Sequence, residues 1–209
     1  MAFIKKQQSS TETEDERQAP RDFEGLCEEL NHADSQVRRW AVRDLVEMPN
    51  ASSVLVDRLE HENNVSVRTG ILNALAQLRD TISLNGLIEC LRSEDAALRN
   101  ESIEILKELP DEVGAILENL LKDSDSDVRI FAVNILESLR HENVEKWLIS
   151  VIEKDSHVNV CSTALDLLSE VGSEQAIPAI KKLKARFPDE PYVCFSADLA
   201  LKRIEEGSQ

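Results

Sequence analysis

The chain has 209 residues, of which 42% are hydrophobic but only 4% aromatic, with 6 Gly and 6 Pro. Its formal net charge of -16 at pH 7 would be repelled by a polyphosphate backbone or an anionic bilayer, so we expect no nucleic-acid partner and no membrane insertion. The low Gly and Pro content favours helices over a turn-rich β fold, and no apolar run nears the ~18 residues that span a bilayer.

The first twenty residues, MAFIKKQQSSTETEDERQAP, are polar and carry no sustained hydrophobic periodicity. Such a segment cannot bury enough apolar surface to fold, so residues 1–20 are expected to form a disordered tail whose removal would leave the thermal midpoint nearly unchanged. The segment also lacks the apolar stretch of a secretory signal, and the four cysteines are scattered without a C-x-x-C pair. These features favour a reducing, cytoplasmic setting.

One apolar pattern then recurs along the chain at intervals of 30 to 33 residues. Each unit has an apolar anchor, a mostly small residue four positions later, a leucine at eight and another apolar residue at eleven, and these offsets fall on one face of a helix. The anchors are Val37, Val67, Leu98, Val128, Val160 and Val193; the last positions of the stripe are Met48, Leu78, Leu109, Leu139, Val171 and Ile204. Six amphipathic helices are therefore predicted.

Helix start signals stand three residues before each anchor. The first four units have Asp34, Asn64, Asp95 and Asp125, short acceptors suited to capping the free N–H groups of a first turn. The last two units have His157 and Glu190, and Pro191 then takes the first helical position, where its missing N–H costs nothing.

A second apolar-periodic segment precedes each of these helices. The six segments read FEGLCEEL, SSVLVDRL, LNGLIECL, EVGAILENLL, VEKWLISVI and AIPAIKKL. Because one pair of antiparallel helices cannot bury both apolar faces alone, neighbouring pairs must stack. The sequence predicts an all-α fold, a right-handed α-solenoid (superhelix) of about six helix pairs over residues 21–205, followed by a short C-terminal tail at 206–209.

The Asp-x-x-Val-Arg start followed by the Ala and Leu stripe resembles HEAT repeats, in particular the short type named after phycobilisome lyases. The stretch VGSEQAIPAIKKLK is similar to the entry to the first helix of that type, with Gly172 ending one helix and Pro178 bending the next. The resemblance covers roughly residues 21–205.

This resemblance implies a structural ladder in which an arginine after each anchor pairs with the Asp caps of adjacent units. The arginines are Arg38, Arg68, Arg99 and Arg129. Cys161 and Cys194 replace them in units five and six, so the ladder should end there. Equivalent positions on stacked helices lie about 8–10 Å apart, beyond the ~7 Å limit for a disulfide, so both thiols should stay free.

Two His-Glu pairs, His61-Glu62 and His141-Glu142, bear on metal binding, because deoxyhypusine hydroxylases of HEAT-like architecture bind two irons through such pairs. His61 lies six residues before the anchor Val67, whereas His141 lies thirteen after Val128, so the two pairs end different helices. We interpret both as solvated helix ends. No metal site, cofactor or catalytic residue is predicted.

The repeat pattern therefore predicts a non-enzymatic function: a protein-protein interaction scaffold or adaptor that binds a partner protein on the concave face lined by the second helices. The resemblance leaves one alternative open, a lyase-type or pigment-handling accessory enzyme related to phycobilin lyases. A visible absorbance shift on mixing with tetrapyrroles would distinguish the two.

Positions on the second helices that point away from the buried stripe give the candidate contact surface. Trp and Arg most often dominate interface energies, and Trp40 is bracketed by arginines in an acidic protein. The alternative for the two aromatic candidates, Trp40 and Phe131, is that their side chains fill the seam with the adjoining unit. The predicted partner-binding residues are Arg39, Trp40, Arg43, Asn73, Phe131 and Asn134.

Overall fold

The computed structural model describes residues 22–139 and 141–207, so the predicted tail at 1–20 lies outside the described residues. Within these ranges the chain forms thirteen α-helices, two short 3-10 helices and no strand. The α-helices are α1 (Phe23–Leu30), α2 (Ser35–Leu45), α3 (Ala51–Leu59), α4 (Val65–Leu78), α5 (Thr81–Glu89), α6 (Ala96–Lys107), α7 (Pro110–Gly114), α8 (Leu117–Leu120), α9 (Ser126–Leu136), α10 (Val144–Lys154), α11 (Val158–Val171), α12 (Ile177–Arg186) and α13 (Pro191–Gly207).

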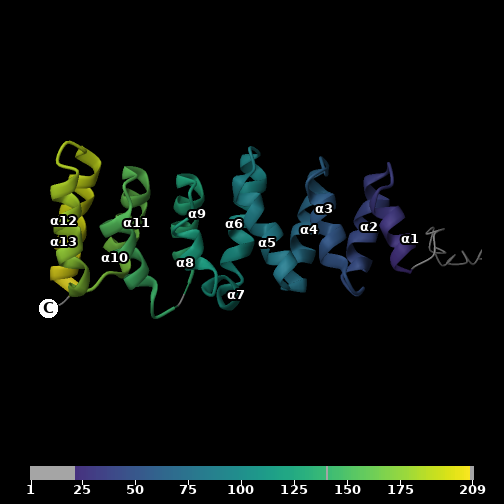
Figure 1. Cartoon of the computed structure of the whole chain (residues 1–209), viewed down its shortest axis with the longest axis horizontal. Helices are drawn as coiled ribbons and strands as arrows, with labels where there is room; N and C mark the ends of the chain where they lie inside the picture. The colour runs from purple at the N-terminus through teal and green to yellow at the C-terminus, as the bar shows by residue number, and fades with distance from the viewer. Residues whose placement is uncertain (1–21, 140, 208–209) are drawn as a thin grey trace, which may run out of the picture.

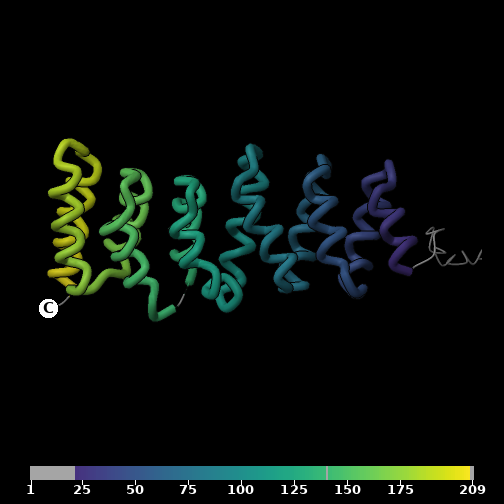
Figure 2. Tube along the Cα trace, viewed as in Figure 1, coloured from purple at the N-terminus to yellow at the C-terminus, as the bar shows by residue number. Residues whose placement is uncertain are grey.

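The helices stand in pairs that form a single row, from α1–α2 at one end to α12–α13 at the other (Figure 1). The tube in Figure 2 follows the chain along this row, so units adjacent in sequence are adjacent in space. With α7 and α8 together taking the place of one helix, the described chain holds six pairs. The predicted α-solenoid is confirmed.

Short polar side chains begin the second helices as predicted. Asp34 accepts the N–H of Gln36, and Asn64, Asp95 and Asp125 cap α4, α6 and α9 in the same way. His157 makes no such bond at the start of α11. Each cap satisfies a backbone donor that would otherwise lack a partner, and is worth about 1 kcal/mol.

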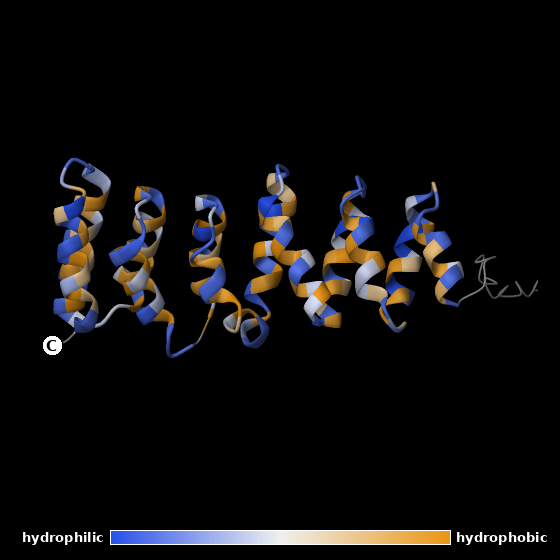
Figure 3. Cartoon of the chain, in the orientation of Figure 1, coloured by the Kyte–Doolittle hydropathy of each residue, from blue (hydrophilic) through white to orange (hydrophobic). Residues whose placement is uncertain are grey.

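The core lies in the seams between helices, where the predicted stripe is largely buried. Leu45, Leu75, Leu106, Leu136 and Leu168 are each at most 1% exposed. Orange apolar segments recur on the helices of every pair in Figure 3, while the connecting loops are mostly blue. Met48, Leu78, Leu98 and Leu201 are partly buried, whereas Val171 departs from the prediction and is 48% exposed.

The first helix of unit four is interrupted, contrary to the continuous segment expected at 112–121. It forms two short helices, α7 and α8, joined through Ala115 and Ile116. The N–H of Ile116 bonds to the carbonyl of Val113, a tighter three-residue closure than an α-helix makes. The last helix also differs from the expected boundary, since α13 continues to Gly207 and so includes part of the tail predicted at 206–209.

The arginine ladder exists, but most of its acidic partners are not the predicted caps. Only Arg68 contacts the cap of the next unit, Asp95, at 2.6 Å. Arg38 pairs with Glu62 at 2.8 Å and Arg129 with Asp155 at 2.6 Å, each two residues before the next cap. Glu62 and Asp155 follow the first helix of the next unit. Arg38 and Arg129 each bond to this acid and also to a loop carbonyl of their own unit.

In unit five, Cys161 stands where the ladder arginine would be, and an arginine from unit six reaches back to the same place. Arg186, at the end of α12, donates to the carbonyls of Ile152, Glu153 and Asp155 and to the Cys161 sulfur at 3.1 Å. Cys161 and Cys194 are free thiols, as predicted. The series of ladder arginines therefore ends at unit four. In unit five, Arg186 of α12 bonds to the loop carbonyls instead.

The second helices form the tighter of the two layers. Packing is continuous from α2 to α4, α6, α9, α11 and α13, whereas successive first helices pack closely only at α3–α5 and α10–α12. We call the exposed side of this continuous second-helix layer the inner face, and the exposed side of the first helices the outer side. Within the described ranges, no helix is long and apolar enough to cross a membrane.

Candidate functional site

A groove of about 580 Å³ lies between α2 and α4 on the inner face. Its residues come from two neighbouring second helices, which the stacking of units one and two holds side by side. A methyl group at Gly70 would meet Val42 at 3.8 Å, so these helices already approach closely at the groove floor. The lining residues are Arg39, Trp40, Val42, Arg43, Val46, Ser66, Thr69, Gly70, Asn73, Ala74 and Gln77.

Four of the six predicted contact residues meet in this groove. Arg39, Trp40 and Arg43 form the wall on α2, and Asn73 stands on the α4 wall. Arg39, Arg43 and Asn73 are exposed, and Trp40 is half-buried. The side chain of Arg43 is 63% exposed and its contact with Asp44, at 3.2 Å, is a weak surface pair. Both guanidinium groups can therefore reach a ligand.

The other two predicted residues, Phe131 and Asn134, lie apart from the groove, on α9 in unit four. Phe131 is half-buried against the core, and the guanidinium carbon of Arg99 lies 5.9 Å from the centre of its ring. Phe131 thus fills the seam between units three and four, which was the alternative for the aromatic residues. The six predicted residues therefore do not form a single patch.

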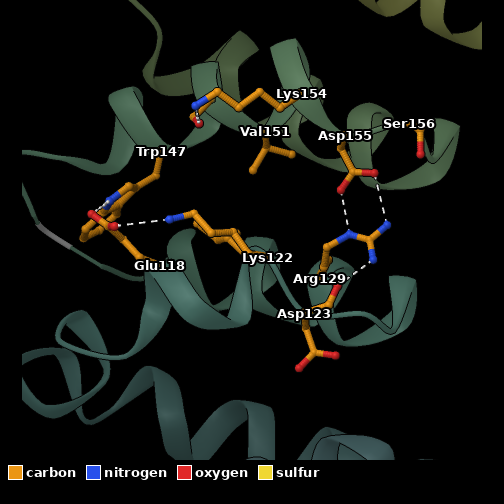
Figure 4. A pocket seen from close by; sticks show the side chains of 11 residues that line it. Glu118, Lys122, Asp123, Arg129, Trp147, Val151, Lys154, Asp155 and Ser156 are labelled. Atoms are coloured by element: carbon orange, nitrogen blue, oxygen red, sulfur yellow. Dashed lines mark hydrogen bonds and ion pairs between the residues drawn. The ribbon is translucent and has the colours of Figure 1, made fainter.

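A second groove, of about 490 Å³, lies on the outer side between α8 and α10 (Figure 4). The Trp147 indole N–H donates to Glu118 at 3.2 Å, and Lys122 lies 3.5 Å from the same carboxylate. These two contacts, the Trp147 bond first, lower the pKa of Glu118. The sequence placed Trp147 only in an apolar helix, so no sequence signal marked this groove.

The far end of this outer groove is closed by the ladder pair Arg129–Asp155 (Figure 4). Burial raises the pKa of Asp155, but hydrogen bonds from Arg129 and the His157 N–H outweigh that effect and leave the pKa below its ordinary value. The charged groups nearest this end are therefore already paired within the protein, which makes the outer groove a weaker candidate for recognition of a charged ligand.

The His-Glu pairs agree in part with the interpretation given to them, since His61, His141 and Glu142 are exposed and only Glu62 departs from it. Glu62 is a buried carboxylate, not a solvated helix end, and accepts hydrogen bonds from Arg38, Arg58 and the Asn64 N–H. His141 stacks on Trp147, with ring centres 4.8 Å apart. Over residues 22–139 and 141–207, no three His, Cys, Asp or Glu side chains gather as metal ligands would. Both carboxylate oxygens of Glu62 already accept hydrogen bonds from Arg38 of the arginine ladder.

Comparison with known proteins gives a family and a fold. The family model described as HEAT repeats matches residues 23–107 and 114–197. No curated protein matches the chain. Among solved structures, a microtubule polymerase with tumor overexpressed gene (TOG) domain arrays is similar with a TM-score of 0.55 and 14% identity, over 87% of this chain and 45% of that one.

Two further solved structures are similar to this chain at lower scores. A complex of CpcE and CpcF of phycocyanin lyase from Nostoc sp. PCC7120 has a TM-score of 0.37 and 18% identity, over 93% of this chain and 97% of that one. A designed armadillo repeat protein in complex with the peptide (KR)4 has a TM-score of 0.42 and 18% identity, over 86% and 98%. At these identities the likeness concerns the fold alone.

Proposed function

Because this chain belongs to the HEAT-repeat family, we propose that it is a non-catalytic scaffold or adaptor that holds a partner protein on the inner face of its solenoid. Stacked helix pairs create an extended surface along one layer, and this surface is typical of protein-binding scaffolds. A cytoplasmic setting is part of the proposal; the four free thiols support it, because they are compatible with a reducing compartment.

The groove between α2 and α4 is the observation that carries this proposal. It combines a partly exposed tryptophan with two exposed arginines, the residue types that contribute most to binding at protein interfaces. The floor is apolar, from Val42, Val46 and Ala74, so a ligand side chain can be desolvated there while its polar groups meet the walls. Such a combination suits recognition of another polypeptide.

The test compares partner capture by the wild type with capture by the double variant Trp40→Ala and Arg43→Glu. Partners held by the inner face should bind the variant at least tenfold more weakly, which corresponds to about 1.4 kcal/mol. Binding is measured by quantitative affinity purification and then, with the purified partner, by calorimetry. Circular dichroism and melting of the variant establish that it is folded. If loss of the half-buried Trp40 ring disturbs α2, the single variant Arg43→Glu is tested instead.

The matched control is Lys181→Glu on α12, an exposed cation in the outer layer. It makes the same change in net charge as Arg43→Glu and should leave binding unchanged. The proposal fails if a folded inner-face variant captures the same partners with the same affinity as the wild type, or if Lys181→Glu weakens binding equally.

A further inference from the structure

The α2–α4 groove differs chemically from two other hollows of this acidic protein, because no carboxylate is among its lining residues. Glu118, Asp123 and Asp155 line the outer groove. The hollow between α1 and α3 includes Asp57 and Glu60. The α2–α4 groove instead offers Arg39 and Arg43, in a chain whose net charge is -16. The nearest carboxylates lie outside the lining: Asp44 contacts Arg43 at 3.2 Å, and Glu101 accepts from the Thr69 hydroxyl at 3.4 Å. The exposed guanidinium groups of the lining favour an anionic ligand at this place.

The two walls of the groove have different chemistry. The α2 wall is cationic and aromatic, from Arg39, Arg43 and Trp40, and Arg39 makes no ion pair among the described residues. The α4 wall is neutral and polar; its side chains are hydroxyls and carboxamides from Ser66, Thr69, Asn73 and Gln77. A ligand lying between the helices therefore meets charge on one side and neutral hydrogen-bonding groups on the other.

The spacing along the walls corresponds to an extended peptide. Arg39 and Arg43 are four residues apart on α2, a rise of about 6 Å, and Asn73 and Gln77 repeat the same rise on α4. In an extended chain, alternate residues point the same way and lie about 6.6 Å apart. Every second side chain of such a peptide can face the arginines, and the intervening ones face the carboxamides.

We infer that the α2–α4 groove binds an extended acidic segment of the partner protein, in which carboxylates on alternate residues face Arg39 and Arg43 and small polar residues between them face α4. This inference rests on the proposed scaffold function and specifies the chemistry of the segment that the scaffold recognises. Trp40 supplies apolar contact along the same wall, so that the segment is held by more than charge.

A nucleic acid is the other anionic macromolecule to consider, and the charge balance disfavours it. Binding of a polyphosphate depends on neutralising several consecutive phosphates, whereas this groove offers two arginines on a protein of net charge -16. A peptide with a few carboxylates matches the available positive charge without bringing further negative charge close to the surface.

The experiment measures fluorescence anisotropy of a labelled peptide, Gly-Glu-Ser-Glu-Ser-Glu-Gly, titrated with the full-length protein at low salt. We expect saturable binding, a dissociation constant that rises steeply with NaCl, and no binding of the peptide in which each Glu is replaced by Gln. The double variant Arg39→Glu and Arg43→Glu should bind at least tenfold more weakly. The matched double variant Lys181→Glu and Lys182→Glu, with the same net charge but an altered outer layer, should bind as the wild type does.

Four outcomes would overturn the inference. Equal binding to both double variants would show that overall charge, not the groove, determines binding. Tighter binding of the isomeric peptide Glu-Gly-Ser-Glu-Ser-Gly-Glu, with Glu at every third position, would show a helical ligand. More effective competition by a ten-residue oligo-dT would indicate nucleic acid. The protein's own Glu12, Glu14 and Glu16 have the same alternation, and a fivefold rise in affinity on changing all three to Gln would assign the groove to that segment instead.

Failure of the inference can be separated from failure of the scaffold proposal. If the acidic peptide does not bind but the Trp40 and Arg43 changes still abolish partner capture, the inner face binds a partner of different chemistry and only the inference is lost. If neither the peptide nor any partner depends on these residues, both proposals fail.

Discussion

Glu62 joins the first two units through a buried carboxylate, and replacing it by glutamine should cost about 3 kcal/mol at neutral pH. Its side chain is 1% exposed and accepts hydrogen bonds from Arg38 at 2.8 and 2.9 Å, from Arg58 at 2.8 Å and from the Asn64 N–H at 2.8 Å. Burial raises the pKa of Glu62, but these bonds outweigh it and lower the pKa from 4.5 to about 2. At ~1.4 kcal/mol per pKa unit, this difference corresponds to about 3 kcal/mol.

The pH dependence of the variant's deficit provides a sharper test than its size. Because the folded-state pKa of Glu62 lies below the unfolded value, its contribution is fully present above pH 4.5 and is lost as the pH falls towards about 2. Glutamine carries no titrating group. The difference in unfolding free energy between the wild type and Glu62→Gln should therefore be largest near neutral pH and shrink across this window. Urea unfolding followed by far-UV circular dichroism measures it at each pH.

Glu153→Gln is the matched control, since it removes an exposed pair between units. Lys182 approaches Glu153 at 3.4 Å with side chains 72% and 38% exposed, so solvent screening limits the cost to less than about 1 kcal/mol. A cost for Glu62→Gln no larger than that of the control, or a deficit that stays constant as the pH falls, would refute the reasoning that Glu62 acts as a buried ionised group.

Three further changes test other parts of the fold. Leu136→Ala removes a side chain that is 1% exposed in the seam of unit four, so chemical denaturation should show a loss of about 2–5 kcal/mol; a cost near zero would mean that the repeat register is wrong. A methyl group at Gly86 would lie 2.5 Å from the stiff Val56 side chain, so Gly86→Ala should lower the melting temperature, whereas Gly70→Ala, with 3.8 Å available, should leave it unchanged or raise it. The Cys161 thiol, whose pKa is raised first of all by burial, should react with a thiol reagent no faster than the folded protein opens; rapid labelling without denaturant would contradict its burial.

Much of this fold follows from the sequence because it depends on a local pattern that recurs. The caps and the leucine at each eighth position fix where the second helices begin and which face they bury, and neither needs long-range information. The interruption at Ala115 and Ile116 could not be predicted in this way. Its segment, EVGAILENLL, has the apolar pattern of one continuous helix, yet the structure divides it into α7 and α8.

Side-chain partners were less predictable than helices. The pattern places Arg38 on a known face, but a long guanidinium can reach several loop residues, and it pairs with Glu62 rather than with the cap two residues later. Likewise, Arg39, Arg43 and Asn73, which helical offsets assign to one side of the second helices, line one groove, whereas the same offsets could not show that Arg99 would cover Phe131. Helical periodicity gives the direction of a residue; it does not give the identity of its neighbour across a seam.

The reach of Arg186 into unit five limits how freely the repeats could be exchanged. In units one, three and four, the loop carbonyls are bonded by an arginine of the same unit, as Arg38 does for His32 and Ala33. In unit five, the carbonyls of Ile152, Glu153 and Asp155 accept from Arg186 of unit six, and only Asp155 also accepts from its own unit, through the Cys161 thiol. A recombinant array that duplicated or shuffled single repeats would therefore keep these loop bonds of unit one after a cut between units one and two. A cut between units five and six would remove the Arg186 bonds, so transfer of these two units as one cassette preserves them.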